Sequence, residues 1–194
     1  MRRRLLAGLV PLVVVSALVA LPAAAQAAPP HWFQGKVEVT SPTTVTTGGS
    51  LTFTMPMATI KCTVTDAEEI WNPVGGGAGE DQMLSFALTA CKVKVGTSAC
   101  PKKGSSPVVI PLGLPWRSIL VAGTPIRDEF PKVGFKVACN AGAVPDEFFG
   151  SLSPAVGKGK LVFGGPGSGT LLDAFSNKME VAGNDTLVGK YTAM

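Results

Sequence analysis

Leu51-Thr-Phe-Thr-Met55 and, shortly after it, Ile60-Lys-Cys-Thr-Val64 alternate strictly between apolar and polar side chains. A period of two places successive side chains on opposite faces of a strand, so each segment predicts a half-buried β-strand. The same alternation recurs in Lys36–Thr40, Leu84–Leu88, Val133–Val137 and Lys178–Ala182. The pattern therefore predicts that β-strands dominate the secondary structure.

Weaker strand candidates fill much of the remaining chain, at residues 108–112, 118–122, 148–152, 160–163, 169–175 and 186–190. Gly and Pro separate the candidates at intervals that leave little room for a helix. No segment after residue 30 carries an amphipathic helical stripe. We therefore expect an all-β fold, either an antiparallel β-sandwich or a closed β-barrel of roughly nine to twelve short strands. Periodicity does not separate these two architectures.

Residues 1–27 have the three parts of a cleavable signal peptide in the required order. The arginines Arg2 to Arg4 precede an apolar run, expected to be helical, from Leu5 to Leu21. Small residues then lead to Ala25-Gln26-Ala27, which fits the rule for cleavage between Ala27 and Ala28. The sequence thus predicts a protein secreted to the extracellular space or cell envelope. The remaining chain has no second apolar run long enough to span a bilayer.

The mature part is close to neutral once this segment is set aside. The chain has 17 basic and 13 acidic residues, and three of the basic residues lie in the signal peptide. The surplus left in residues 28–194 is too small for neutralising a nucleic-acid backbone, so we expect no nucleic-acid partner. A chain of this length can bury one core, and no sharp boundary divides it. We expect residues 28–194 to form a single disulfide-linked β domain.

All four cysteines, Cys62, Cys91, Cys100 and Cys139, follow the signal peptide. An even number in an exported chain predicts disulfides. The spacing favours Cys91 with Cys100 around a short loop, and this leaves Cys62 with Cys139 as a bridge between inward strand positions. The chain has no C-x-x-C motif and one His, so we expect no metal, no redox couple and no cofactor.

No catalytic constellation emerges from the sequence. The sole histidine, His31, lies just past the cleavage site, where we expect a solvated residue in a flexible terminal segment. The glycine cluster Gly164–Gly169 lacks the Lys and the following helix of a phosphate loop and predicts a turn. Two carboxylates from different segments, for instance Asp128 and Glu147, could still converge in a cleft as in a hydrolase.

Charged residues gather locally although the net charge is small. Five acidic residues bracket a glycine-rich loop, and we expect them to form a solvated sheet edge: Asp66, Glu68, Glu69, Glu80 and Asp81. A basic group follows: Lys92, Lys94, Lys102 and Lys103. Its favoured role is to keep a strand edge soluble, and the alternative is contact with anionic wall polymers or lipid head groups.

Several short segments are similar to a loose group of uncharacterised, exported, β-rich proteins of high-GC bacteria, over roughly residues 58–190. They are Ile60-Lys-Cys62, Leu114-Pro-Trp116, Ile126-Arg-Asp-Glu129, Gly167-Ser-Gly-Thr-Leu171 and Gly183-Asn-Asp-Thr-Leu187. The resemblance implies a secreted bacterial β domain with paired cysteines. It transfers no catalytic or binding residue.

Three functions are compatible with these observations. The favoured one is a secreted or cell-surface β-sandwich module with a structural or binding role, without catalysis, whose partner is a cell-wall polymer or an extracellular protein. The first alternative is a β-barrel that encloses a small apolar ligand, which requires a cavity beyond core packing. The second is the carboxylate-based hydrolase.

Overall fold

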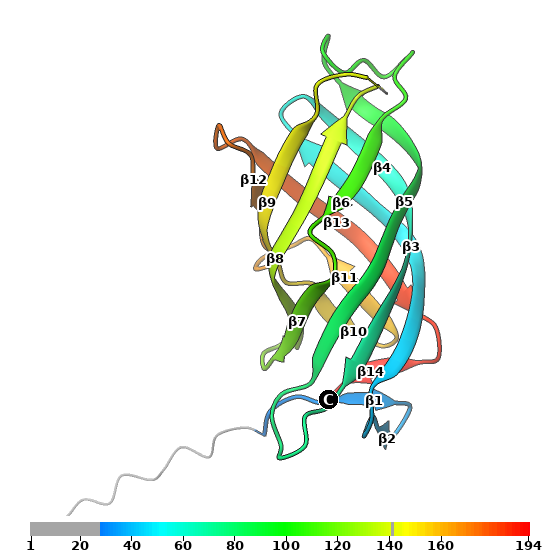
Figure 1. The fold of residues 1–194 in the computed structure, drawn as a ribbon, viewed down its shortest axis with the longest axis vertical. Coiled ribbons are helices and arrows are strands. Elements are labelled where there is room, and N and C mark those ends of the chain that lie inside the picture. The colour runs from blue at the N-terminus through cyan, green and yellow to red at the C-terminus, as the bar shows by residue number, and fades with distance from the viewer. Residues whose placement is uncertain (1–27, 141) are drawn as a thin grey trace, which may run out of the picture.

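Fourteen strands and no helix make up the part of the chain that the computed structural model describes, residues 28–140 and 142–194 (Figure 1). The predicted signal peptide and its cleavage site lie outside or at the edge of this range. The strands are β1 (Trp32–Gln34), β2 (Val37–Glu38), β3 (Thr43–Met55), β4 (Ala58–Trp71), β5 (Glu80–Gly96), β6 (Val108–Leu112), β7 (Trp116–Val121), β8 (Arg127–Ala138), β9 (Asp146–Leu152), β10 (Ala155–Gly157), β11 (Lys160–Phe163), β12 (Leu171–Leu172), β13 (Lys178–Leu187) and β14 (Tyr191–Ala193). The all-β prediction is confirmed.

Eight of these strands close into a barrel. The antiparallel order is β3-β4-β5-β7-β8-β10-β11-β13, and β13 pairs back with β3 from Glu180↔Thr54 to Leu187↔Thr47. The ring closes where β5 pairs with β7, from Glu80↔Ile119 to Met83↔Trp116, whereas the rest of β5 has no ladder with β6 among the described residues. Of the two architectures that the sequence allows, the structure therefore has the barrel. Within the described residues, no helix is long and apolar enough to cross a membrane.

The long strand β8 belongs to both halves of the barrel. Its first residues pair with β7 and β10, and its later residues pair with β6 and β9. β9 continues through β12 to β13, so the upper wall in Figure 1 is built from different short strands than the lower wall. The lower half is the one that holds the candidate site.

A small terminal sheet, β2-β1-β14, lies at the lower end of the barrel (Figure 1). The His31 N–H donates to the Met194 carbonyl at 2.9 Å, and the Met194 N–H donates back at 3.1 Å. Trp32 is fully buried, and the Asn72 side chain bonds both its N–H and its carbonyl oxygen. The prediction of a flexible terminal segment around His31 was therefore wrong, because the C-terminal strand pairs with it.

The main strands are longer than the sequence predicted, because polar residues continue the alternation beyond the apolar segments. β4 runs for 14 residues and β5 for 17. A bulge in β5 opposite the Ala67/Glu68 step leaves Leu84 without a register partner, and its side chain is exposed. Phe86, two residues on, points back into the core. One extra residue thus reverses the face that a strand presents.

All four cysteines form disulfides, as expected, but the predicted pairing was wrong. The structure joins Cys62 to Cys91 and Cys100 to Cys139. β4 and β5 are neighbours, and a bulge places Cys91 beside Cys62. β5 continues as an extended strand to Gly96, which carries the chain away from Cys91 before Cys100 is reached.

Candidate functional site

The middle of the barrel interior is filled by an aromatic layer. The Phe135 ring lies 5.2 Å from Phe53, 5.9 Å from Phe86 and 5.3 Å from Trp116, measured between ring centroids in edge-on arrangements. The Trp116 Nε1–H donates to the Leu112 carbonyl at 2.8 Å, so the indole has its polar partner while it packs in the core. This layer separates the lower interior from the upper end.

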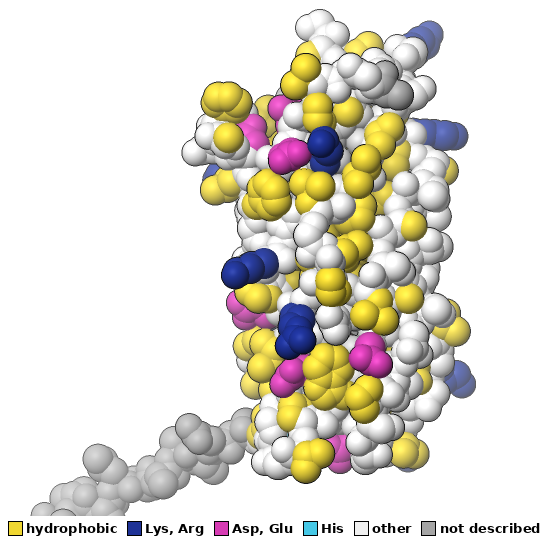
Figure 2. Space-filling view, in the orientation of Figure 1, with side chains coloured by type: hydrophobic (Ala, Val, Ile, Leu, Met, Phe, Trp, Pro, Cys, Tyr) yellow, Lys and Arg dark blue, Asp and Glu magenta, His cyan; other side chains and the backbone are white. Residues whose placement is uncertain are grey.

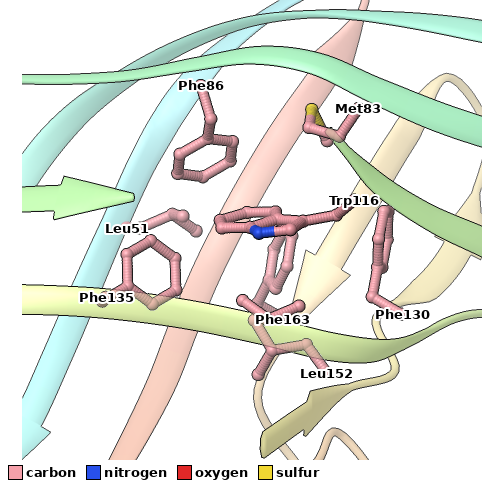
Figure 3. A pocket seen from close by; sticks show the side chains of 9 residues that line it. Leu51, Met83, Phe86, Trp116, Phe130, Phe135, Leu152 and Phe163 are labelled. Carbon is pink, nitrogen blue, oxygen red and sulfur yellow. The ribbon is translucent and has the colours of Figure 1, made fainter. Parts of the chain in front are cut away.

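The apolar side chains shown in Figure 3 surround a hollow of about 10 Å³. A single water molecule needs roughly this much space, so the hollow is a packing defect in a filled core. A small apolar ligand would need several hundred cubic ångströms, roughly 300 Å³ or more. At this place in the barrel, the enclosed-ligand alternative has no room for its ligand.

Below the aromatic layer the interior is acidic. Five buried side chains form what we call the carboxyl cluster: Asp66, Glu68, Asp81, Asp128 and Asp185. They come from four strands of the ring, namely β4, β5, β8 and β13. The hydroxyl groups of Thr47 on β3 and Ser118 on β7, both buried, lie on the two intervening strands. Six neighbouring strands therefore present a polar side chain to one interior region.

The strand alternation explains why these residues point inward. On β4, Asp66 and Glu68 are in phase with the buried residues Cys62, Val64 and Ile70. Because successive inward positions on a strand are two residues apart, both carboxyl groups must enter the barrel with their apolar neighbours. The same argument places Asp185 two residues before the buried Leu187 on β13.

The carboxyl groups lie next to one another rather than next to cations. Asp66 faces Asp185, and the Thr47 hydroxyl donates to Asp66. Asp81 faces Asp128, with the Ser118 hydroxyl beside both. Both carboxyl oxygens of Glu68, Asp81, Asp128 and Asp185 lack a hydrogen-bond partner of ordinary geometry among the described residues. Two carboxyl groups can form a hydrogen bond with each other only when one of them carries a proton and donates it.

Burial raises the pKa of every member of the carboxyl cluster. Burial and the adjacent Asp185 raise the pKa of Asp66 to about 8. Burial and the charges of Asp66, Asp128 and Asp185 raise the pKa of Glu68 well above its usual range. Burial, and to a smaller extent the charges of Asp128 and Glu68, raise the pKa of Asp81 well above its usual range.

Burial is also the largest cause of the raised pKa values of the two remaining members, Asp128 and Asp185. Burial raises the pKa of Asp128, and contacts with Asp81 and Ser118 lower it by less. Burial also raises the pKa of Asp185, while contacts with Asp66, Thr47 and the Thr186 backbone act in the opposite direction. In each pair one carboxyl group thus becomes the better acceptor and its neighbour the proton carrier.

The free-energy cost of burying charge favours protonated carboxyl groups in the cluster. Each unpaired buried carboxylate costs several kcal/mol, and a domain is stable by only about 5–15 kcal/mol. Five ionised groups would exceed that margin. No Lys, Arg or His among the described residues is buried with them, and no three His, Cys, Asp or Glu side chains of these residues are arranged to hold a metal ion. Burial without an opposite charge therefore favours the protonated form of these carboxyl groups in the native barrel.

The prediction of a solvated acidic edge was wrong for three of its five members. Asp66, Glu68 and Asp81 lie inside the barrel, whereas Glu69 and Glu80 are partly exposed. The spacing of these acids along their strands could have revealed their burial. An acidic residue that lies an even number of residues from buried apolar residues on a strand points to the same face as they do. Charged residues rarely enter a core, and for this reason the sequence predicts that these three acids are exposed.

The other predicted site residues do not assemble. Asp128 and Glu147 do not converge: Asp128 is buried in the carboxyl cluster, whereas Glu147 is exposed on β9 and pairs with Lys136 at 3.3 Å. The His31 Nδ1 lies 2.5 Å from the Glu38 carboxylate, at the terminal sheet. Gly164–Gly169 forms a loop between β11 and β12, in accord with the predicted turn.

The outer surface carries apolar and basic regions. In Figure 2, apolar side chains lie over β6, β8 and β9, where Ile110 and Phe149 are exposed. The four lysines of the predicted basic group are exposed or nearly so at the end of β5 and in the loop that follows. Lys61 on β4 stands directly opposite Lys92 on β5, and both are exposed.

No protein-family model matches this sequence, and the comparisons with curated proteins and with solved structures find no significant similarity.

Proposed function

We propose that this chain is a secreted or cell-surface β-barrel module with a binding role, and that its partner is an anionic polymer of the cell envelope. The observation that carries the proposal is the exposed pair Lys61 and Lys92, which lie directly opposite each other on neighbouring strands. Like charges in this position destabilise a sheet. A bound polyanion would remove that penalty.

The charge distribution around this pair supports the same partner. From Gln82 to Arg127 the chain contains no acidic residue and six basic ones. Lys94 lies two residues beyond Lys92 on β5, and a strand presents residues two apart on the same face. The wall formed by β4, β5 and the following loop is thus positive although the mature chain is almost neutral.

A role without catalysis is supported by the placement of the acids and of the histidine. The carboxyl cluster is enclosed by the barrel wall, so its members do not meet a substrate from solution. His31, which a serine or cysteine nucleophile would need as its base, is bonded to Glu38 at the opposite end from the lysines.

Export is supported by the two disulfides, which form and persist in oxidising compartments. The test is mass spectrometry of the protein from its native culture. We expect a chain that begins at Ala28, recovered outside the cytoplasm with all four cysteines oxidised. Recovery of the full-length chain from the cytoplasm with reduced cysteines would contradict export.

The binding role is tested by titrating the purified mature protein with long-chain polyphosphate. We expect binding that weakens as NaCl increases, because the Debye length falls from about 10 Å at 0.1 M to about 3 Å at 1 M. A variant with Gln at three lysines of the positive wall should bind at least tenfold more weakly: Lys61, Lys92 and Lys94.

The matched control removes the same charge from the lower end of the barrel, through Gln at the exposed residues Lys158, Lys160 and Lys190. It should bind like the wild type. Equal loss of binding in both variants would mean that net charge alone matters. No saturable binding by the wild type would reject a polyanion as partner.

A further inference from the structure

The carboxyl cluster is more than an isolated buried acid, because it extends around most of the barrel wall. The buried side chains on the elements around it are, by element, Thr47 on β3, Asp66 and Glu68 on β4, Asp81 on β5, Ser118 and Leu120 on β7, Asp128 on β8, Val156 on β10, Leu161 on β11, Asp185 on β13, Trp32 and Tyr191 at the terminal sheet, and Asn72, which bonds Trp32. In the terminal sheet, His31 is paired with Glu38. No buried Lys, Arg or His of the described residues therefore offsets the new charge when the cluster loses protons.

We propose that the carboxyl cluster is a proton-dependent latch on the barrel: the wall is closed between β8 and β10 while the carboxyl groups keep their protons, and it opens there when they lose them. This inference concerns the interior and does not depend on the polyanion partner. Either proposal can fail without the other.

The β8–β10 seam is the weakest closure of the ring. β10 has three residues, and its ladder with β8 consists of the pair Ala155↔Arg127. Two further backbone bonds support it, from the Val156 N–H to the Ile126 carbonyl at 2.9 Å and from the Asp128 N–H to the Pro154 carbonyl at 3.0 Å. By contrast, β3 and β4 pair along their whole length.

Asp128 connects the charge to the seam. Its backbone N–H donates across the seam to Pro154, and its side chain is fully buried in the carboxyl cluster opposite Asp81. Ionised carboxyl groups on β4, β5, β8 and β13 would repel one another across the interior and push these strands outward. This outward force stretches the ring, and the ring separates first where the fewest backbone hydrogen bonds hold it. That place is the β8–β10 seam.

The pH window follows from the sign of the pKa shifts. The native state holds protons that the open or unfolded chain releases, because burial raises the pKa of each cluster member. Closure is then strongest below the ordinary carboxyl pKa and is lost as pH rises. For Asp66 this window extends from the ordinary aspartate pKa of 3.8 to about 8. Each proton released raises the opening constant about tenfold per pH unit.

Hydrogen exchange of the mature, oxidised protein, read by mass spectrometry between about pH 6 and about pH 9 and corrected for intrinsic exchange rates, tests the latch. We expect amides of residues 154–163 to lose protection progressively with pH, while those of residues 51–64 keep it. The first range covers β10 and β11, and the second covers the β3–β4 hairpin. This measurement needs no variant.

Two substitutions on β8 sharpen the result. Asp128→Asn should reduce the pH dependence of exchange in residues 154–163 by about tenfold per pH unit, because the amide can donate to Asp81 in place of the proton that the pair shares, and one proton fewer is then released. Glu129→Gln is the matched control, because Glu129 is the next residue and its side chain is exposed. It should exchange like the wild type. If Asp128→Asn does not fold, the wild-type profile still decides the proposal.

Three outcomes would overturn the latch. Protection in residues 154–163 that does not change with pH would show that no proton is released on opening. Simultaneous loss of protection in residues 51–64 would mean global unfolding instead of local opening. Stabilisation by CaCl₂ at about pH 8, relative to EDTA, would mean that a cation neutralises the cluster in place of protons.

Discussion

Asp66→Asn should make the barrel less sensitive to rising pH. Asp66 is 6% exposed, and burial raises its pKa to about 8 from the ordinary aspartate value of 3.8. The native wild-type protein therefore holds a proton here that the unfolded chain has released. An asparagine cannot ionise, and its NH₂ group can donate to Asp185, which is what the Asp66 proton does in the wild type.

The size of the effect follows from linkage. One retained proton costs the native state about 1.4 kcal/mol of unfolding free energy per pH unit between the two pKa values. From about pH 5 to about pH 8 the wild type should lose about 4 kcal/mol through Asp66, a loss that the variant is spared. The free energy of unfolding of the variant, relative to wild type, should rise by this amount over the interval.

Urea unfolding, followed by the fluorescence of the buried residues Trp32 and Trp116, measures this difference at several pH values. Glu69→Gln is the control, because Glu69 is on the same strand and only partly buried. It should follow the wild-type pH profile. If Asp66→Asn also keeps the wild-type profile, Asp66 is ionised in the native barrel and the reasoning from burial is refuted.

Three further changes test the fold. Replacement of Cys100 and Cys139 by Ser should cost about 4 kcal/mol by the loop-entropy relation, measured by urea unfolding, because the bridge spans 39 residues; non-reducing peptide mapping should recover these two cysteines in one peptide. Gly49→Ala should lower the melting temperature and Gly48→Ala should not, since a Cβ at Gly49 would collide with the Asn184 carbonyl of β13, whereas at Gly48 the nearest atom is 4.0 Å away. Phe135→Ala should cost about 3–5 kcal/mol in urea unfolding, because Phe135 is fully buried among three aromatic rings.

Much of the wall could be predicted from local alternation. The inward positions Ile60, Cys62 and Val64 are all buried, and so are Val133 and Phe135. A strand has a fixed period, so a few residues suffice to assign its two faces. Bulges defeat this reasoning, as Leu84 shows, because one unpaired residue shifts the phase without a signature in the sequence.

The candidate site was missed for a different reason. The phase of Asp66 and Glu68 with their apolar neighbours was visible in the sequence, but the ordinary cost of burying charge favoured an exposed edge. That cost applies to an ionised group. In the barrel the acids come together and keep protons, and no segment by itself reveals that Asp128 and Asp185 will join Asp66 and Glu68 from other strands.

Local chemistry by itself therefore determined that the chain forms strands, which face of most strands is apolar, and that four cysteines should pair. Tertiary structure decided the barrel rather than the sandwich, the partner of each cysteine, and the assembly of the carboxyl cluster. The physical reason is that alternation is set between residues one or two apart, whereas closure and pairing depend on which distant strands become neighbours. The protonation of Asp66 depends on that closure, because only a complete wall removes its carboxyl group from water.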